Sequence, residues 1–168
     1  MPQLVTPAIE YQLSFLAALA EYHEERRHLE LGVATLRDPG TFARYVAALL
    51  AEERPLPVDH SGRVPQNNLW WVEGDQYIGR IAVRHRLNAG LRRVGGHIGY
   101  EIRPSRRHAG HATAMLAATL PLAGALGIDP VLITCDVNNT ISRRVIEANG
   151  GGYAGRDADE LHFWVPTS

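Results

Sequence analysis

The sequence predicts one domain of the α/β or α+β class that spans residues 1–168. Its length suits a single domain, because typical domains contain about 100–200 residues. Hydrophobic residues make up 45% of the chain, which is enough for a packed core. Strand-like and helix-like segments follow one another in the order β-α-α-β-β-β-α-β-α-β, and helices placed between strands indicate a sheet covered by helices.

Two helices are expected in the first third of the chain. Thr6 is a candidate N-cap and Pro7 suits the first helical position, and apolar residues at helical spacing extend this helix to about residue 29. A second helix begins after Asp38 and ends before Pro55. The stretch 55–66 is rich in proline and turn-forming residues, so it is a predicted loop.

Strands are predicted at 4–5, 69–72, 77–85 and 97–103, where β-branched and aromatic residues lie between turn-forming residues. The turn at 73–76 joins the second and third of these strands into a hairpin. A turn-rich connection then leads to the strand at 97–103.

The last third of the chain alternates helices and strands. A helix is expected over 110–126, and Pro121 should bend it, because an interior proline costs about 3 kcal/mol or kinks the helix. An apolar run predicts a buried strand at 131–136. A helix over 139–149 and a strand at 162–165 complete the pattern.

Composition excludes several classes of protein. A net charge of -1 argues against non-specific nucleic-acid binding. All 17 basic residues are arginine, so lysine-dependent chemistry such as a Schiff base or a nucleotide-hydrolysing P-loop is excluded. The only cysteine, Cys135, lies in an apolar run and is expected to be a buried, inert thiol. The sequence carries no apolar run long enough for a membrane span and no signal peptide, so a cytoplasmic protein is expected.

An anion site is predicted where the strand at 97–103 meets the helix at 110–126. The first amides of a helix lack intrahelical partners, and the helix dipole places positive charge there. Arg106 and Arg107 add full charges, and Gly110 lets the backbone approach a ligand closely. The expected ligand is a pyrophosphate. The candidate binding residues are Ile102, Arg103, Arg106, Arg107, His108, Ala109, Gly110, His111, Ala112 and Thr113.

Two motifs resemble those of the GNAT (GCN5-related N-acetyltransferase) superfamily. Arg107-x-x-Gly110-x-Ala112 is similar to its R/Q-x-x-G-x-G/A signature, and Asn139 and Ser142 occupy its N-x-x-S position. The resemblance covers roughly residues 69–165. It implies a mixed, mostly antiparallel sheet in which two central strands, here 97–103 and 131–136, diverge to admit the pantetheine arm of acetyl-CoA.

The resemblance also implies ligand roles. The loop would hold the pyrophosphate of coenzyme A, and Asn139 and Ser142 would hold the pantetheine amides or the phosphate side. For Asn139, a helix N-cap is an alternative role that its position equally supports.

The catalytic residues are harder to place, because the chain departs from the family pattern. Where many members carry a tyrosine acid, this chain has Ile146, and where some carry a glutamate base it has Thr134. The remaining candidates are His97 and Glu101 as general base, which share one strand face, and Tyr153 as acid. Ordinary structural roles for the first two stay open, and so does catalysis by positioning alone.

The resulting expectation is an acetyl-CoA-dependent N-acetyltransferase without a metal that acts on a primary amine. The acceptor is a small molecule or a peptide N-terminus, and Glu24 and Glu25 are candidate contacts for a cationic amine. His108 and His111 lack further metal ligands at complementary spacing. The alternatives left open are a catalytically silent acetyl-CoA sensor and a transferase for longer acyl groups. A homodimer is also left open, whereas membrane and nucleic-acid partners are not expected.

Overall fold

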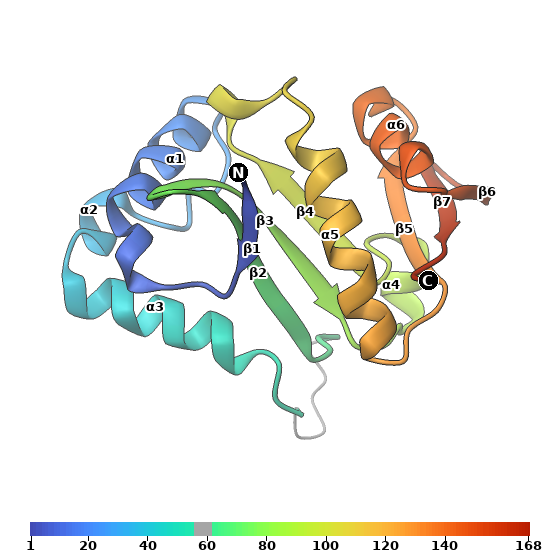
Figure 1. The fold of residues 1–168 in the computed structure, drawn as a ribbon, viewed down its shortest axis with the longest axis horizontal. Helices are drawn as coiled ribbons and strands as arrows, with labels where there is room; N and C mark the ends of the chain where they lie inside the picture. Colours follow the sequence, from blue (N-terminus) through green and yellow to red (C-terminus); the bar gives the residue numbers. More distant parts are fainter. Residues whose placement is uncertain (56–61) are drawn as a thin grey trace.

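The computed structural model describes residues 1–55 and 62–168, so most of the loop expected at 55–66 lies outside the described residues. Two antiparallel sheets form the centre of the protein (Figure 1). The first has the order β1-β2-β3-β4, with strands at Gln3–Val5, Gln66–Glu73, Gln76–Arg84 and Ile98–Ile102. The second has the order β5-β7-β6, with strands at Val131–Asp136, Glu160–Val165 and Gly152–Asp157.

Helices flank both sheets. In Figure 1 the three N-terminal helices lie to one side of the first sheet, and α5 runs across its front. The helices are α1 (Gln12–Glu24), α2 (Val33–Leu36), α3 (Pro39–Ala51), α4 (Ala89–Arg93), α5 (His111–Ala125) and α6 (Thr140–Ala148). Short 3-10 turns precede α1 at Ile9–Tyr11 and follow β4 at Pro104–Arg106.

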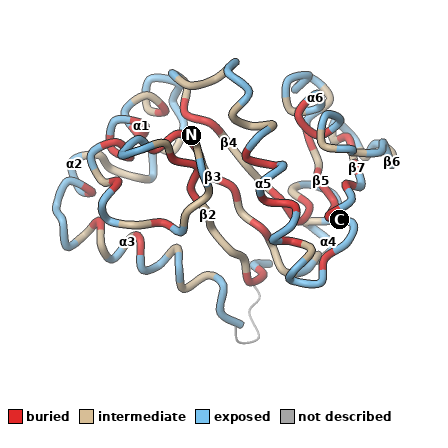
Figure 2. The backbone as a smooth tube through the Cα atoms, in the orientation of Figure 1, coloured by how far each residue is buried: buried red, intermediate tan, exposed pale blue. Residues whose placement is uncertain are grey.

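The first sheet has a hydrophobic core on each face, and Figure 2 shows buried backbone on both sides of it. Adjacent side chains on a strand point to opposite faces. Accordingly, Trp70 packs among the aromatic residues of α1 and α3, whereas Trp71 belongs to the core under α5 and α6. The ring of Trp70 stacks on Phe15 with centroids 5.2 Å apart. Buried side chains cover much of both faces of this sheet. A functional site can therefore form only where polar residues interrupt these cores.

The two sheets meet at the beginnings of β4 and β5. The amide of His97 donates to the carbonyl oxygen of Leu132 at 2.8 Å, and the amide of Gly95 donates to Oγ1 of Thr134 at 2.8 Å. Gly96 has a φ of +60°, and a Cβ there would overlap the Leu132 carbonyl, so only glycine permits this approach. Beyond this junction β4 pairs only with β3 and β5 only with β7 in the described residues. The predicted divergence of these two strands is therefore confirmed.

Most predicted elements are present, and the differences have local causes. The first helix begins at Gln12 rather than Thr6, after a 3-10 turn, and it ends at Glu24. Positive φ angles at Arg26 and His28 stop it short of residue 29. Strand β6 was not predicted, because its sequence contains two glycines and its side chains are largely exposed.

Candidate functional site

The segment between β4 and α5 presents six unpaired backbone amides. No acceptor in the described residues receives the N–H groups of 108–113, and the first helical bond runs from the amide of Ala114 to the carbonyl of Gly110. Gly110 has a φ of +81°, and a Cβ built there would meet no atom within 4 Å. Amides without a partner in the protein are available to water or to the oxygen atoms of a ligand. The loop therefore remains a candidate anion site, with open space beside Gly110.

The arginines of this loop are held by carboxylates. Arg103 is buried and its guanidinium pairs with Glu21 on α1 at 2.9 Å. Arg106 pairs with Glu73 at 3.2 Å.

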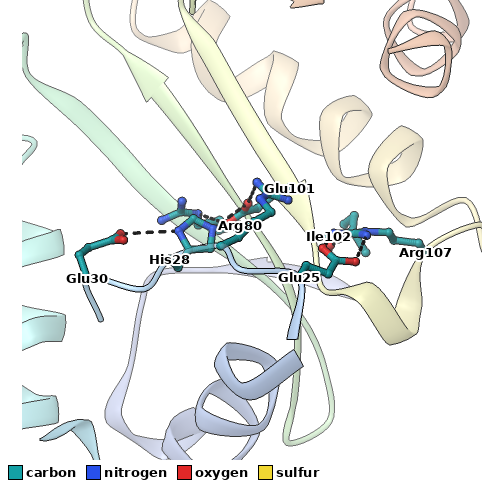
Figure 3. Close-up of polar contacts among 8 residues, drawn as sticks. Glu25, His28, Glu30, Arg80, Glu101, Ile102 and Arg107 are labelled. Carbon is teal, nitrogen blue, oxygen red and sulfur yellow. Dashed lines mark hydrogen bonds and ion pairs between the residues drawn. The ribbon is translucent and has the colours of Figure 1, made fainter. Parts of the chain in front are cut away.

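The signature arginine, Arg107, is directed toward α1. Its two terminal nitrogens donate to the carboxylate of Glu25 at 2.7 and 3.0 Å, and its Nε donates to the carbonyl oxygen of Ile102 at 3.3 Å (Figure 3). This pairing raises the pKa of Arg107 despite its partial burial. The three loop arginines therefore fix the loop against α1 and the hairpin, and the backbone amides are the donors that it leaves without a partner in the described residues.

Glu25 was a candidate contact for a cationic acceptor. Its pairing with Arg107 lowers the pKa of the carboxyl and directs it toward the loop. Glu24 is exposed at the end of α1.

His111, at the first position of α5, accepts a hydrogen bond on Nδ1 from the indole of Trp71 at 3.2 Å. Burial, assisted by the charge of Arg106, lowers the pKa of His111. The neutral imidazole then carries its proton on Nε2. Its neighbours Ala112 and Thr113 are half-buried in the first turn, whereas His108 and Ala109 are exposed. His108 has a φ of +62°, which is uncommon for a residue other than glycine.

The motif after β5 forms a cap and a hydroxyl pair. The side chain of Asn139 accepts from the amide of Ser142 at 3.1 Å and so caps α6. The hydroxyl of Ser142 lies 2.7 Å from the hydroxyl of Tyr100 on β4. The ring of Tyr100 is half-buried against the core, and its hydroxyl reaches from β4 to α6, the helix that follows β5.

The positions at which family members carry acid or base residues are structural here. Ile146 is fully buried, and Thr134 binds the amide of Gly95 through its hydroxyl. Cys135 is buried as expected, and burial raises the pKa of its thiol. None of these three side chains is placed to exchange a proton with a ligand.

Glu101 accepts hydrogen bonds from two arginines and a histidine (Figure 3). Its carboxylate accepts from Arg27 at 2.8 Å, from Nε2 of His28 at 2.8 Å and from Arg80 at 2.7 Å. Its side chain is only 12% exposed. His28, which sequence reasoning missed, reaches this carboxylate because the chain turns after α1 with positive φ at Arg26 and His28. No periodic pattern in the sequence marks such a turn.

A cavity of about 240 Å³ opens on the same face of the first sheet. Its floor is formed by Arg80, Ala82 and Arg84 of β3 and by Gly99 and Glu101 of β4, and α3 lines one side. The sequence indicates that alternate residues of one strand share a face, but it does not show that β2, β3 and β4 bring their polar residues into one cavity.

His97 and Tyr153 lie away from this cavity. His97 is 8% exposed at the junction of the sheets, where its Nδ1 accepts from the amide of Leu132 at 2.9 Å. Tyr153 is 58% exposed on β6 and packs edge-on against Phe163. Of the three residues predicted as catalytic, Glu101 alone lines the cavity. The catalytic roles of all three stay predictions.

His97 should make the stability of the protein depend on pH. Burial, followed by the charges of Arg92 and Arg84, lowers the pKa of His97 below its usual 6.5. The unfolded chain then binds a proton more readily than the folded one, so this contribution to stability is present above about pH 6.5 and is lost as the pH falls toward the folded pKa. Chemical unfolding between pH 7.5 and 5.5 measures it. His97→Asn, which keeps an acceptor for the Leu132 amide, should reduce the loss, and an unchanged pH dependence would contradict this role.

The family follows from a direct match. The model of the acetyltransferase (GNAT) domain matches residues 16–151. The chain belongs to this family. Among curated proteins no match was found.

Solved structures agree with this GNAT acetyltransferase in fold. RimJ of Mycobacterium smegmatis, in complex with CoA-disulfide, has a TM-score of 0.66 at 19% identity over 98% of this chain and 80% of RimJ. The microcin C7 self-immunity acetyltransferase MccE, in complex with acetyl-CoA and AMP, has a TM-score of 0.65 at 13% identity over 98% and 92%. The aminoglycoside acetyltransferase AAC(6')-Ib, in complex with coenzyme A and kanamycin, has a TM-score of 0.63 at 12% identity over 99% and 95%.

At these identities the likeness shows the fold alone. Within residues 1–55 and 62–168 of this GNAT acetyltransferase, no helix is long and apolar enough to cross a membrane. The same residues contain no group of three or more His, Cys, Asp or Glu side chains arranged to hold a metal ion.

Proposed function

We propose that this GNAT protein is an acetyl-CoA-dependent N-acetyltransferase that transfers the acetyl group directly to a primary amine. The observation that carries the proposal is the loop after β4 with the first turn of α5, where six amides lack a partner in the described residues and Gly110 borders open space. This space lies at the end of β4 where the two sheets have diverged. Membership of the family supports the proposal. We also propose a cytoplasmic location, as the sequence leads us to expect.

The residues of the loop fit coenzyme A. Backbone amides and a helix N-terminus bind phosphate oxygens without a metal. The residues that would hold the pyrophosphate are His108, Ala109, Gly110, His111, Ala112 and Thr113. Ile102 and Arg103 precede the loop, and Arg106 and Arg107 brace it. Ser142 and Asn139 lie at the start of α6, on the other side of the diverging strands, and Ser142 would contact the pantetheine arm.

Bound acetyl-CoA supplies an activated acetyl thioester, and the chain supplies position and proton transfer. Glu101 is the best-placed acceptor of the amine proton, because it is a carboxylate that lines the cavity on the sheet face. The Tyr100–Ser142 hydroxyl pair lies between the strands and is available to donate a hydrogen bond to the departing sulfur. Tyr153 is too exposed and too far along the second sheet to be preferred over this pair.

A catalytically silent acetyl-CoA sensor is the second candidate function. The observation that favours it is the loss of both usual proton-transfer positions, since Ile146 is buried and Thr134 holds the sheet junction. Three side chains already pair with Glu101, which supports a structural role for this carboxylate as well.

Release of free thiol from acetyl-CoA, measured against a panel of primary amines, separates the two functions. The panel should include amino acids, amino sugars, polyamines and short peptides with free N-termini. The proposal predicts amine-dependent thiol release and acetylated amine in equal amounts. Binding of acetyl-CoA with no release above the rate in buffer, for any member of the panel, would favour the sensor.

A further inference from the structure

Arg84 differs from the other arginines that are removed from solvent. Five arginines in the described residues are buried or half-buried, and four of them pair with a carboxylate: Arg80 with Glu101, Arg103 with Glu21, Arg106 with Glu73 and Arg107 with Glu25. Arg84, the fifth, has no carboxylate partner in the described residues. A half-buried cation without a counterion is costly unless a ligand supplies the charge.

The guanidinium of Arg84 is partly free. Its Nη1 donates to the carbonyl oxygens of Gly95 at 3.0 Å and Gly96 at 3.1 Å. Its Nε and Nη2 have no partner in the described part of the chain. Burial lowers the pKa of Arg84, as expected for a desolvated cation. One edge of the guanidinium is therefore fixed by the protein, and the other edge is left with donors for an oxyanion.

Arg84 lines the cavity that Glu101 also lines. Arg84 follows Arg80 by four residues on β3, so both side chains lie on the same face of the sheet. A Cβ built on Gly99 would lie 3.2 Å from Nη2 of Arg84, which places the guanidinium over Gly99. Gly99 is two residues from Glu101 on β4, and two residues of a strand span about 7 Å. A small molecule can therefore reach both groups.

The cavity is small and its lining is not acidic. Its charged lining residues are the two cations Arg80 and Arg84 and the anion Glu101. Its volume of about 240 Å³ lies below the roughly 300–1,000 Å³ typical of sites for drug-sized ligands. Glu52 lies in a neighbouring cavity that shares Gln66 and Arg84, and it is engaged by the amides of Gln66 and Asn68. This lining disfavours a polycationic acceptor.

Arg84 is also separate from the coenzyme A loop. It lies beside the start of β4, whereas the loop follows the other end of that strand, about five residues or 17 Å away. The phosphates of coenzyme A that the loop would hold are therefore not the anion that Arg84 lacks.

We infer that the acceptor is a small primary amine that also carries an oxyanion, a carboxylate or a phosphate, which binds the free edge of Arg84 while the amine lies near Glu101. This inference rests on the proposed N-acetyltransferase function and gives its substrate class. The planar guanidinium offers a carboxylate or a phosphate two parallel hydrogen bonds, which a neutral amide cannot accept with the same strength.

Paired acceptors test the inference. Thiol release from acetyl-CoA is measured with glycine against glycinamide and with O-phosphoethanolamine against ethanolamine, and the ratio of kcat/KM within each pair is compared between proteins. Wild type should prefer the anionic member of at least one pair. Arg84→Gln should lower that ratio by about tenfold or more, which corresponds to the loss of one charge-assisted interaction. The pair that responds tells whether carboxylate or phosphate is the oxyanion.

The ratio has internal controls. Differences in amine basicity cancel when the same pair is compared in two proteins, and the rate with the neutral member reports the integrity of the fold. Arg84→Lys, which keeps the charge but not the planar fork, should give an intermediate ratio. Arg44→Gln removes an exposed arginine from α3 outside the cavity lining, and it should leave the ratio unchanged.

Two results would overturn the inference while the proposed function stands: preference of wild type for the neutral amines, or the same ratio in Arg84→Gln. If no amine reacts although acetyl-CoA binds, the proposed function itself fails. The Arg84 site is then judged by binding of N-acetylglycine and N-acetylglycinamide to the coenzyme A complex. Binding of N-acetylglycine that depends on Arg84 keeps the site, and its absence removes it.

Discussion

Gly110→Trp is expected to lower the affinity for acetyl-CoA by about a thousandfold, because it fills the open space beside Gly110, which lies among the unpaired amides of 108–113 in the sequence. That factor corresponds to the loss of two charge-assisted hydrogen bonds at roughly 2 kcal/mol each. A Cβ on Gly110 meets no atom within 4 Å, so the indole extends into open space and the core is not disturbed. Calorimetric titration measures the affinity, and thermal unfolding measures the fold.

Gly110→Ala is the matched control. Both variants carry the strain of a side chain at a φ of +81°, which costs roughly 1–2 kcal/mol. The alanine variant fills little of the ligand space, so it should lose stability to a similar degree but keep most of its affinity. Equal losses of affinity in the two variants would mean that the backbone conformation is responsible. Unchanged affinity in Gly110→Trp would remove the loop as the phosphate site.

Glu101→Gln is expected to lower kcat by about a hundredfold or more, which is the usual contribution of a general base. Affinity for acetyl-CoA should stay the same, because the loop amides lie outside the Glu101 cluster. Steady-state kinetics with the best amine of the panel measures kcat, and calorimetric titration measures the affinity.

Arg27→Gln separates catalysis from structure at the same cluster. It removes one of the three partners of Glu101 and leaves the carboxylate, so a purely structural role predicts a similar loss in both variants. We expect Arg27→Gln to lower kcat only a few-fold. A kcat within about twofold of wild type in Glu101→Gln would show that this residue only positions the turn after α1.

Much of the fold follows from sequence, because it depends on local signals. Asp38 caps α3 by accepting from the amide of Thr41, the run 131–136 is a strand from end to end, and Gly150 ends α6 with a positive φ. The exceptions involve short or poorly hydrophobic segments. Helices α2 and α4 contain four and five residues, too few for a periodic pattern, and β6 is stabilised by its pairing with β7 rather than by its own composition.

The candidate site was less accessible from sequence, because it depends on pairs that are distant along the chain. The free amides of 108–113 follow from a local motif and were predicted. The direction of Arg107 was not, since Glu25 lies 82 residues away in sequence. The sequence also did not predict the contact of His28 with Glu101 or that of Ser142 with Tyr100. Nor did it predict that one edge of the Arg84 guanidinium has no partner in the described residues. Each depends on how the strands and helices pack.

Calorimetric titration of the wild-type protein with acetyl-CoA decides whether the loop after β4 is a coenzyme A site. We expect one binding site per chain, with heat that is lost on addition of excess coenzyme A and in Gly110→Trp. An absence of binding heat up to millimolar acetyl-CoA, for a protein that unfolds cooperatively, would contradict the assignment of the loop and the function built on it.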